Sequence, residues 1–279
     1  MTYEAPKAEL VGIAVLAAQP TGAAVGTVDD ASEGAAILLG KRVLIGPIDA
    51  CGQCEVCRRG GAAVCPFAKK REAGRRMRAM SRWLVALGDG LELPLPAAAA
   101  VAGDVATAYT LYARTGLASR DPVVIVGANA VTRFLVEIVR AKGITPTVVV
   151  DGAGAWADWL LGKGAAVVHG EDVHAAVTAA IAAQGVGARP WRVIATEAEA
   201  VPRAAALAGP RATLTALVAA DAPAVPGDLL AREVTVIGVA GPHPDLVVEA
   251  AAMCVKGEID LEGGVGDGDP TRAIVQLVG

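Results

Sequence analysis

The sequence predicts an α/β protein in which a doubly wound parallel sheet follows a β-rich region. Two observations predict this class. From about residue 110 onward, short β-branched runs alternate with amphipathic segments, the order expected of βαβ units. The preceding residues instead hold short apolar runs separated by Gly, Pro and Asp, with no long amphipathic helix, which is typical of a β-rich domain.

The β-rich region is marked by three apolar runs, Leu10 to Leu16, Ala36 to Leu39 and Val43 to Ile45. It ends in a connection, residues 91–102, in which two prolines precede a run of alanines that leads into a helix. We therefore place a domain boundary near residue 105.

The first βαβ unit begins with the run Asp121 to Val126, which reads as a strand buried on both faces and ends at Gly127. Between Val131 and Val139 the apolar residues follow helical spacing, and Gly143 closes the segment. The same reasoning predicts further strands over residues 147–151, 165–169, 191–195, 211–218 and 233–239, and further helices over residues 156–163, 173–183, 201–208 and 245–256.

Composition excludes several classes of function. The 279 residues are 54% hydrophobic, enough for a large core, yet no uninterrupted apolar run reaches the roughly 18 residues of a membrane span. The net charge of −4 and the 3% aromatic content do not favour a nucleic-acid partner. The N-terminus does not resemble a signal peptide, so we expect a cytoplasmic protein.

Four of the five cysteines lie between residues 51 and 65, at Cys51, Cys54, Cys57 and Cys65. In a reducing compartment such a cluster favours a metal over disulfides, and four thiolates close a tetrahedral zinc shell with no position left for water. The cluster therefore predicts one structural zinc ion, with free structural cysteines or an adventitious metal as the alternatives. Cys254, on an apolar helix, is expected to be a small core residue.

The segment from Gly40 through the cysteines to Pro66 resembles the structural-zinc lobe of the zinc-containing medium-chain dehydrogenases, the alcohol dehydrogenase superfamily. The resemblance continues through residues 84–91, 107–109, 115–117 and 257–260. It implies a truncated GroES-like β domain at residues 1–105, a Rossmann-type nucleotide-binding domain at 106–262, and a C-terminal segment, 263–279, that returns to the β domain. It also implies a homodimer formed through the edge strand at residues 232–239.

The catalytic zinc ligands of this family are not matched. No Cys precedes Cys51 and no His precedes His169, and a single carboxylate, Asp104, lies near the position of the third ligand. One carboxylate cannot hold a zinc ion that needs three protein ligands, so Asp104 is interpreted as vestigial or capping. Without zinc, a carbonyl would have to be polarised by a side-chain donor such as Tyr109 or by the nucleotide itself.

The nucleotide fingerprint is also altered. A Gly-x-Gly-x-x-Gly turn is represented by Gly127, Asn129 and Thr132, of which only the first is glycine. Asn129 tolerates a positive φ and its amide can bond a phosphate, whereas Thr132 adds a branched side chain where helix and strand should touch. Asp151 ends the second strand, where a carboxylate accepts the ribose hydroxyls of NAD and disfavours NADP.

Two functions remain open. The first is an alcohol dehydrogenase-like oxidoreductase, zinc-free at the active site, that moves a hydride between NAD(H) and a small alcohol, carbonyl or activated alkene. The second is a catalytically inactive relative that acts as a nucleotide-binding or partner-binding scaffold. Of the three histidines, His243 is the strongest functional candidate because it follows a strand of the parallel sheet.

Overall fold

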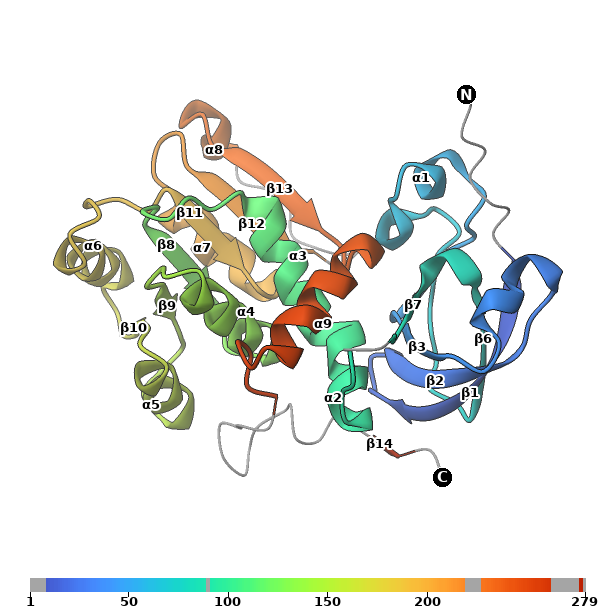
Figure 1. Cartoon of the computed structure of the whole chain (residues 1–279). Helices are drawn as coiled ribbons and strands as arrows, with labels where there is room; N and C mark the ends of the chain where they lie inside the picture. The colour runs from blue at the N-terminus through green and yellow to red at the C-terminus, as the bar shows by residue number, and fades with distance from the viewer. Residues whose placement is uncertain (1–8, 89–90, 219–226, 262–275, 278–279) are drawn as a thin grey trace. The chain divides into compact units, whose positions relative to one another are not determined.

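The computed structural model describes residues 9–88, 91–218, 227–261 and 276–277, and its chain forms two compact units (Figure 1). The first unit comprises residues 1–106, 242–257 and 272–279, and the second comprises residues 107–241 and 258–271. The expected boundary at residue 105 lies beside the one found. Residues 242–257, which were expected in the domain at 106–262, instead belong to the first unit.

The first unit is built on a six-stranded antiparallel sheet that curls into a half-barrel (Figure 1). Its order is β14-β1-β2-β3-β7, with β6 also paired to β1. The strands are β1 Leu10–Ala18, β2 Ala24–Asp30, β3 Arg42–Ile45, β6 Arg76–Met80, β7 Leu84–Ala86 and β14 Gln276–Leu277. Apolar residues that alternate along β1 and β6, such as Val11, Ile13 and Met77, point into one core because side chains of a strand alternate between faces.

One apolar run of this region was read wrongly. Residues 36–39, grouped with the apolar runs that suggested strands, lie mostly in the 3₁₀ helix η1 Glu33–Leu38. Of these residues, Ile37 is 75% exposed and Leu39 is 56% exposed, and only Leu38 packs against the core of the half-barrel. A short apolar run is compatible with a strand or with a 3₁₀ helix. The sheet needs no further strand here, because β2 and β3, which flank the run, pair directly with each other.

A short two-stranded ladder brackets the cysteine lobe, the segment Cys51 to Cys65. The strands β4 Ile48–Asp49 and β5 Lys69–Lys70 pair antiparallel on either side of it. Within and after the lobe the chain forms α1 Glu55–Arg58, η2 Ala62–Val64 and η3 Ser81–Trp83. The lobe is thus closed at its base by backbone hydrogen bonds.

A helical segment follows the half-barrel. It consists of α2 Leu95–Ala100, the π-helical turn η4 Val101–Val105 and α3 Ala106–Thr115. The predicted helix over 245–256 is found as η6 Pro244–Leu246 followed by α9 Val247–Val255, and α9 packs against η4 within the first unit. Cys254 is buried on α9, as expected for a core residue.

The second unit contains a six-stranded parallel sheet of order β10-β9-β8-β11-β12-β13. Its strands are β8 Val123–Val126, β9 Thr147–Val149, β10 Ala166–Val168, β11 Arg192–Ala195, β12 Thr213–Leu217 and β13 Thr235–Val239. Each coincides with a strand predicted from the sequence, shortened by one to three residues at its ends. The strand order reverses beside β8, whose neighbours are β9 and β11, so this point is the topological switch of the sheet.

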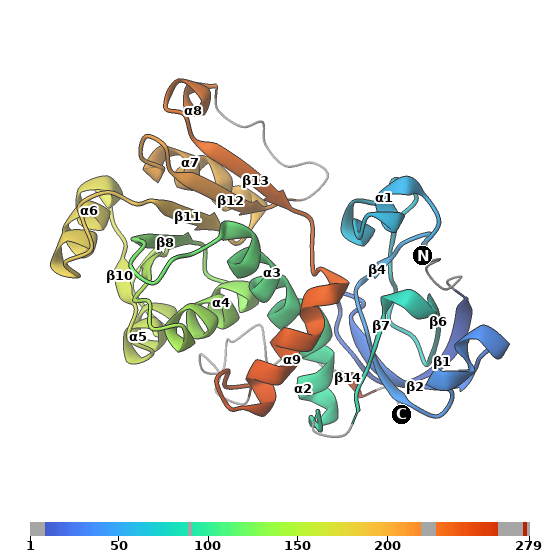
Figure 2. The same ribbon diagram turned by 45° about the horizontal axis from the view of Figure 1, so that its top comes forward.

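Helices cover both faces of the parallel sheet. They are α4 Ala130–Ala141, α5 Ala155–Gly162, α6 Val173–Ala183, η5 Ala198–Ala200, α7 Val201–Leu207 and α8 Asp228–Ala231. Helices α6 and α7 share one core with the sheet, which includes Val124, Val177 and Ala204. Figure 2 shows α4 and α5 on the side opposite α7. The predicted α/β class, a doubly wound parallel sheet preceded by a β-rich domain, is confirmed.

Across the residues that the structure describes, no helix combines the length and the apolar character needed to cross a membrane.

Candidate functional site

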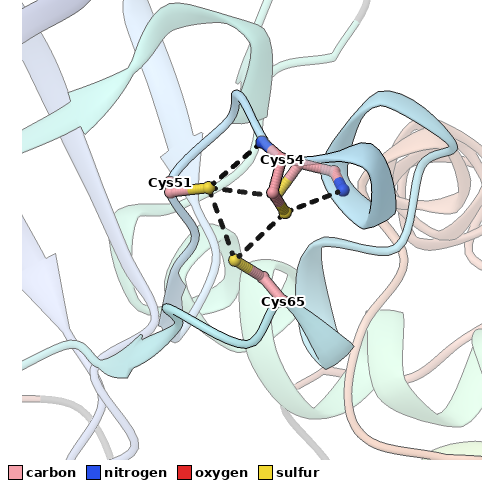
Figure 3. Close-up of side chains that lie close together, drawn as sticks. Cys51, Cys54 and Cys65 are labelled. Atoms are coloured by element: carbon pink, nitrogen blue, oxygen red, sulfur yellow. Dashed lines mark hydrogen bonds between the residues drawn. The ribbon is translucent and has the colours of Figure 1, made fainter.

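The first candidate site is the cysteine lobe. The Sγ atoms of Cys51, Cys54, Cys57 and Cys65 all lie within 4.8 Å of one another. Figure 3 shows Cys51, Cys54 and Cys65 converging, with Cys51 Sγ 3.6 Å from Cys65 Sγ and Cys54 Sγ 3.8 Å from it. Cys57 closes the set, its Sγ lying 3.9 Å from that of Cys51.

These spacings fit a zinc ion. In a tetrahedral shell with Zn–S bonds of about 2.3 Å, the sulfurs are separated by about 3.8 Å, which matches the distances between them. Four soft thiolate donors also select zinc over hard cations. Because all four positions would be filled by protein, the lobe suits a structural ion rather than one that binds substrate.

The backbone of the lobe prepares the sulfurs to act as ligands. The amide N–H of Cys54 donates to Cys51 Sγ, and that of Cys57 donates to Cys54 Sγ, each over 3.4 Å. Hydrogen bonds from the backbone of Gln53 and Cys54 lower the pKa of Cys51 to about 6. Burial instead raises the pKa of Cys57 to about 12, so a bound cation would have to displace its proton.

Two glycines let the chain wrap this site. Gly52 has a φ of 72° and Gly60 a φ of 85°, a region that residues with a Cβ adopt at a cost. Gly60 also lies against His243, whose Nε2 would be 3.3 Å from a Cβ at that position. His243 therefore packs on the cysteine lobe, a contact that its sequence position after a strand of the parallel sheet does not indicate.

The second candidate site is a cavity at the carboxyl ends of β8, β9 and β11, next to the topological switch of the parallel sheet. Its lining includes Gly127, Asp151, Glu197, Glu199, Ala200 and Arg203. The sequence singled out Gly127 and Asp151. It did not single out Glu197, Glu199 or Arg203, although residues that directly follow a parallel strand are the ones expected to line such a crevice.

Of the three positions of the glycine turn, only the first has the positive φ that favours glycine. Gly127 has a φ of 127°, and a Cβ placed there would collide with Thr196 Oγ1. Asn129, in contrast, is extended at a φ of −141° and caps α4, so it does not use its tolerance for a positive φ. Thr132 is fully buried, and its Oγ1 lies 2.7 Å from Thr196 Oγ1, so the branched side chain is accommodated by a hydrogen bond between α4 and β11.

Asp151 lies two residues beyond β9 with its side chain 90% exposed, and its Oδ1 accepts a hydrogen bond from Arg203 Nη1 over 2.7 Å. The edge of the cavity thus carries a carboxylate and a guanidinium side by side. A carboxylate can accept hydrogen bonds from sugar hydroxyls, while the guanidinium adds a positive charge that the sequence does not indicate.

The two weak catalytic candidates lie in different units. Asp104 is partly buried inside η4, where its Oδ2 accepts a hydrogen bond from Gln19 Nε2 over 3.1 Å. It is not a helix cap, since Ala100 and Ala106 flank the turn. Burial raises the pKa of Asp104, against the opposing hydrogen bond from Gln19. Tyr109 lies on α3, half-buried, with its ring 5.7 Å from that of Tyr112.

Among the described residues, the four cysteines form the only group of three or more His, Cys, Asp or Glu side chains whose atoms could hold one metal ion. Within that part of the chain, Asp104 therefore does not form a second metal site together with other potential ligands.

Comparison with known proteins gives structural likeness only. No family model matches the sequence, and no curated protein matches it. An alcohol dehydrogenase from Thermus sp. ATN1 superposes with a TM-score of 0.77 at 18% identity, covering 93% of this chain and 86% of that one. An alcohol dehydrogenase from Escherichia coli CFT073, complexed with NADH, gives 0.74 at 16% identity, covering 92% and 83%.

A third similar structure, described as a zinc-binding dehydrogenase from Sinorhizobium meliloti and bound to NADP, has a TM-score of 0.72 at 20% identity. It covers 93% of this chain and 85% of that one. All three similarities extend over both units, so the half-barrel and the parallel sheet recur together in those proteins. The chain therefore shares the fold of these dehydrogenases, with a Rossmann-type parallel sheet and a GroES-like half-barrel.

Proposed function

We propose that this protein is a dehydrogenase-like oxidoreductase that transfers a hydride between NAD(H) and a small alcohol, carbonyl or activated alkene. The observation that carries the proposal is the cavity at the topological switch, in a fold shared with alcohol dehydrogenases, one of them solved with NADH. NAD(H) would supply or accept the hydride.

The residues of the cavity fit the adenosine end of such a cofactor. Asp151 offers a carboxylate to the ribose hydroxyls, and it lines the same cavity as Gly127. The phosphate end fits less well, because Asn129 already caps α4 and the Glu197 carboxylate faces the glycine turn.

We propose that the reaction does not use a catalytic zinc ion, since the candidate ligands of the described residues gather only in the cysteine lobe. The zinc ion of that lobe would hold the half-barrel in shape. Polarisation of a carbonyl would then fall to a side-chain hydroxyl, for which Tyr109 is the candidate, or to the cofactor.

A specific observation favours a second function, that of a catalytically inactive scaffold which binds a nucleotide or a protein partner. The amide of Asn129 donates to Glu197, so the position where a pyrophosphate normally binds is occupied by the protein's own polar groups. The two proposals differ in whether a bound nicotinamide cofactor reacts.

We further propose a homodimer formed through β13. This strand is one edge of the parallel sheet, and among the described residues its outer side has no partner strand. Val236 on it is 39% exposed, so the edge carries apolar surface. We propose no nucleic-acid or membrane partner, a small molecule as the substrate, and a cytoplasmic location.

Thermal-shift titration with NADH, followed by activity assays of aldehydes with NADH and of alcohols with NAD⁺, tests the first function. Stabilisation together with oxidation of NADH by an aldehyde, or reduction of NAD⁺ by an alcohol, supports it. Stabilisation without turnover, over a broad set of substrates, would favour the scaffold, and the absence of both at millimolar NADH would contradict nucleotide binding altogether.

A further inference from the structure

Four polar side chains form a clasp between the ends of β8 and β11. We name Asn129, Thr132, Thr196 and Glu197 the polar clasp. Asn129 Nδ2 donates to the carbonyl oxygen of Thr196 and to Glu197 Oε2, each over 3.1 Å. Thr132 and Thr196 join their hydroxyls across 2.7 Å, and Thr196 Oγ1 also lies 3.2 Å from the carbonyl oxygen of Val126.

The clasp uses donors at the start of α4. The backbone N–H of Thr132 donates to Asn129 Oδ1 over 3.0 Å, and the N–H of Asn129 donates to Thr132 Oγ1 over 3.3 Å. In dinucleotide-binding sheets, free N–H groups at this helix end hold the pyrophosphate. Here these two donors are satisfied within the chain.

A negative charge lies at the same place. A Cβ on Gly127 would stand 3.2 Å from Glu197 Oε1, so the carboxylate rests directly against the turn that a pyrophosphate approaches. Glu199 adds a second carboxylate to the cavity, and Arg203 is paired with Asp151 rather than with Glu197. A diphosphate entering this turn would therefore meet like charge at short range.

We propose that Glu197 is a specificity-determining residue, which makes the cavity prefer the uncharged adenosine part of a ligand over its diphosphate. This inference rests on the proposed function, because it assumes that a nucleoside ligand binds at the cavity. The inference adds that NAD(H) is bound mainly through its adenosine half and that Glu197 repels its phosphates.

Calorimetric titration with adenosine, ADP and NADH tests the proposal in the full-length protein and in Glu197→Gln. Wild-type protein should bind adenosine about tenfold more tightly than ADP. Glu197→Gln removes the charge but keeps an oxygen that accepts from Asn129, so it should raise the affinity for ADP and NADH about tenfold and leave adenosine unchanged.

Glu199→Gln is the matched control, since it removes the same charge from the same cavity without touching the clasp. It should change ADP affinity by less than about threefold. An equal gain in ADP affinity in both variants would overturn the assignment to Glu197. It would show that the total negative charge of the cavity, rather than Glu197 in particular, disfavours ADP.

The salt dependence of ADP binding is measured on the wild-type protein, so this test does not depend on whether a variant folds. If Glu197 repels the diphosphate, added NaCl screens the repulsion, and the affinity of wild-type protein for ADP should rise between about 50 and 500 mM. A site that attracts phosphate would show the opposite trend.

The outcomes separate this inference from the proposed function. Tight binding of NADH or ADP, weakened by salt and unchanged in Glu197→Gln, overturns the role of Glu197 and leaves the oxidoreductase proposal standing. Failure of adenosine, ADP and NADH to bind any of the three proteins overturns both.

Discussion

The role of Asp104 in the structure differs from the role that its sequence position suggests. Its position suggested a remnant of a metal ligand, yet in the π-helical turn it accepts a hydrogen bond from buried Gln19. Gly103 enables this contact, because a Cβ there would collide with Gln19 Oε1. Asp104 thus belongs to a small polar network that ties the end of β1 to the helical segment.

The raised pKa of Asp104 predicts a pH-dependent stability. A carboxyl group whose pKa is raised by folding stabilises the fold fully below its ordinary value of 3.8, and this contribution is lost as pH rises through the folded value. Asp104→Asn keeps the shape and cannot ionise. Its stability relative to wild type, from urea unfolding between pH 3 and 8, should therefore rise with pH above about 4. A constant difference would contradict the shift.

Glu137 and Lys163 form a second coupled group, on α4 and just after α5. Lys163 Nζ lies 2.7 Å from Glu137 Oε1 and 3.3 Å from Asp260 Oδ2. Burial raises the pKa of Glu137. The pKa of Lys163 is lowered by burial, but its hydrogen bonds and charge interactions with Glu137 and Asp260 prevail and raise it.

Lys163→Met should destabilise the protein by about 3 kcal/mol, since it removes the ammonium group that pairs with the buried carboxylate of Glu137, which is 5% exposed. Adding Glu137→Gln to that variant should recover part of the loss because the buried side chain at position 137 is then uncharged. A double-mutant cycle by urea unfolding measures the coupling, and additive losses would show that the pair does not interact.

At the scale of elements, the strands of the parallel sheet were predictable because each is a short β-branched run that must be buried on both faces. The run at residues 36–39 was not, since periodicity cannot separate a short strand from a 3₁₀ turn. The cysteine site could be predicted from spacing alone, because its ligands are local. Glu197 could not, since its contact with Asn129 joins residues 68 positions apart and depends on β8 and β11 being neighbours.

The cysteine lobe predicts a metal-dependent element. Metal analysis should find one zinc ion per chain, and removing it with a chelator should lower the midpoint of thermal unfolding by several degrees. Cys57→Ser should lose the ion because Cys57 is fully buried among the other sulfurs. Cys254→Ser, remote from the cluster in sequence, serves as the control and should keep the ion. Two ions per chain would contradict the absence of a catalytic zinc.

At the scale of the whole molecule, the edge of the parallel sheet leads to a prediction about assembly. Ile237→Pro places a residue without an N–H in the middle of β13 and should yield monomers or aggregates by size-exclusion chromatography. Ile237→Val preserves the strand and is the matched control. An unchanged dimer in the proline variant would show that β13 is not the interface.

The return of residues 242–257 to the first unit bears on the order in which the chain can fold during synthesis. Five strands of the half-barrel, β1, β2, β3, β6 and β7, leave the ribosome first. Helix α9, which packs on η4 with Val247, Ala250 and Met253 buried, is made only after the entire parallel sheet. The unit that begins the chain is therefore the one completed last. A nascent chain that has not yet reached α9 would leave uncovered the apolar surface of η4 on which α9 packs, and transiently exposed apolar surface of this kind is prone to aggregation.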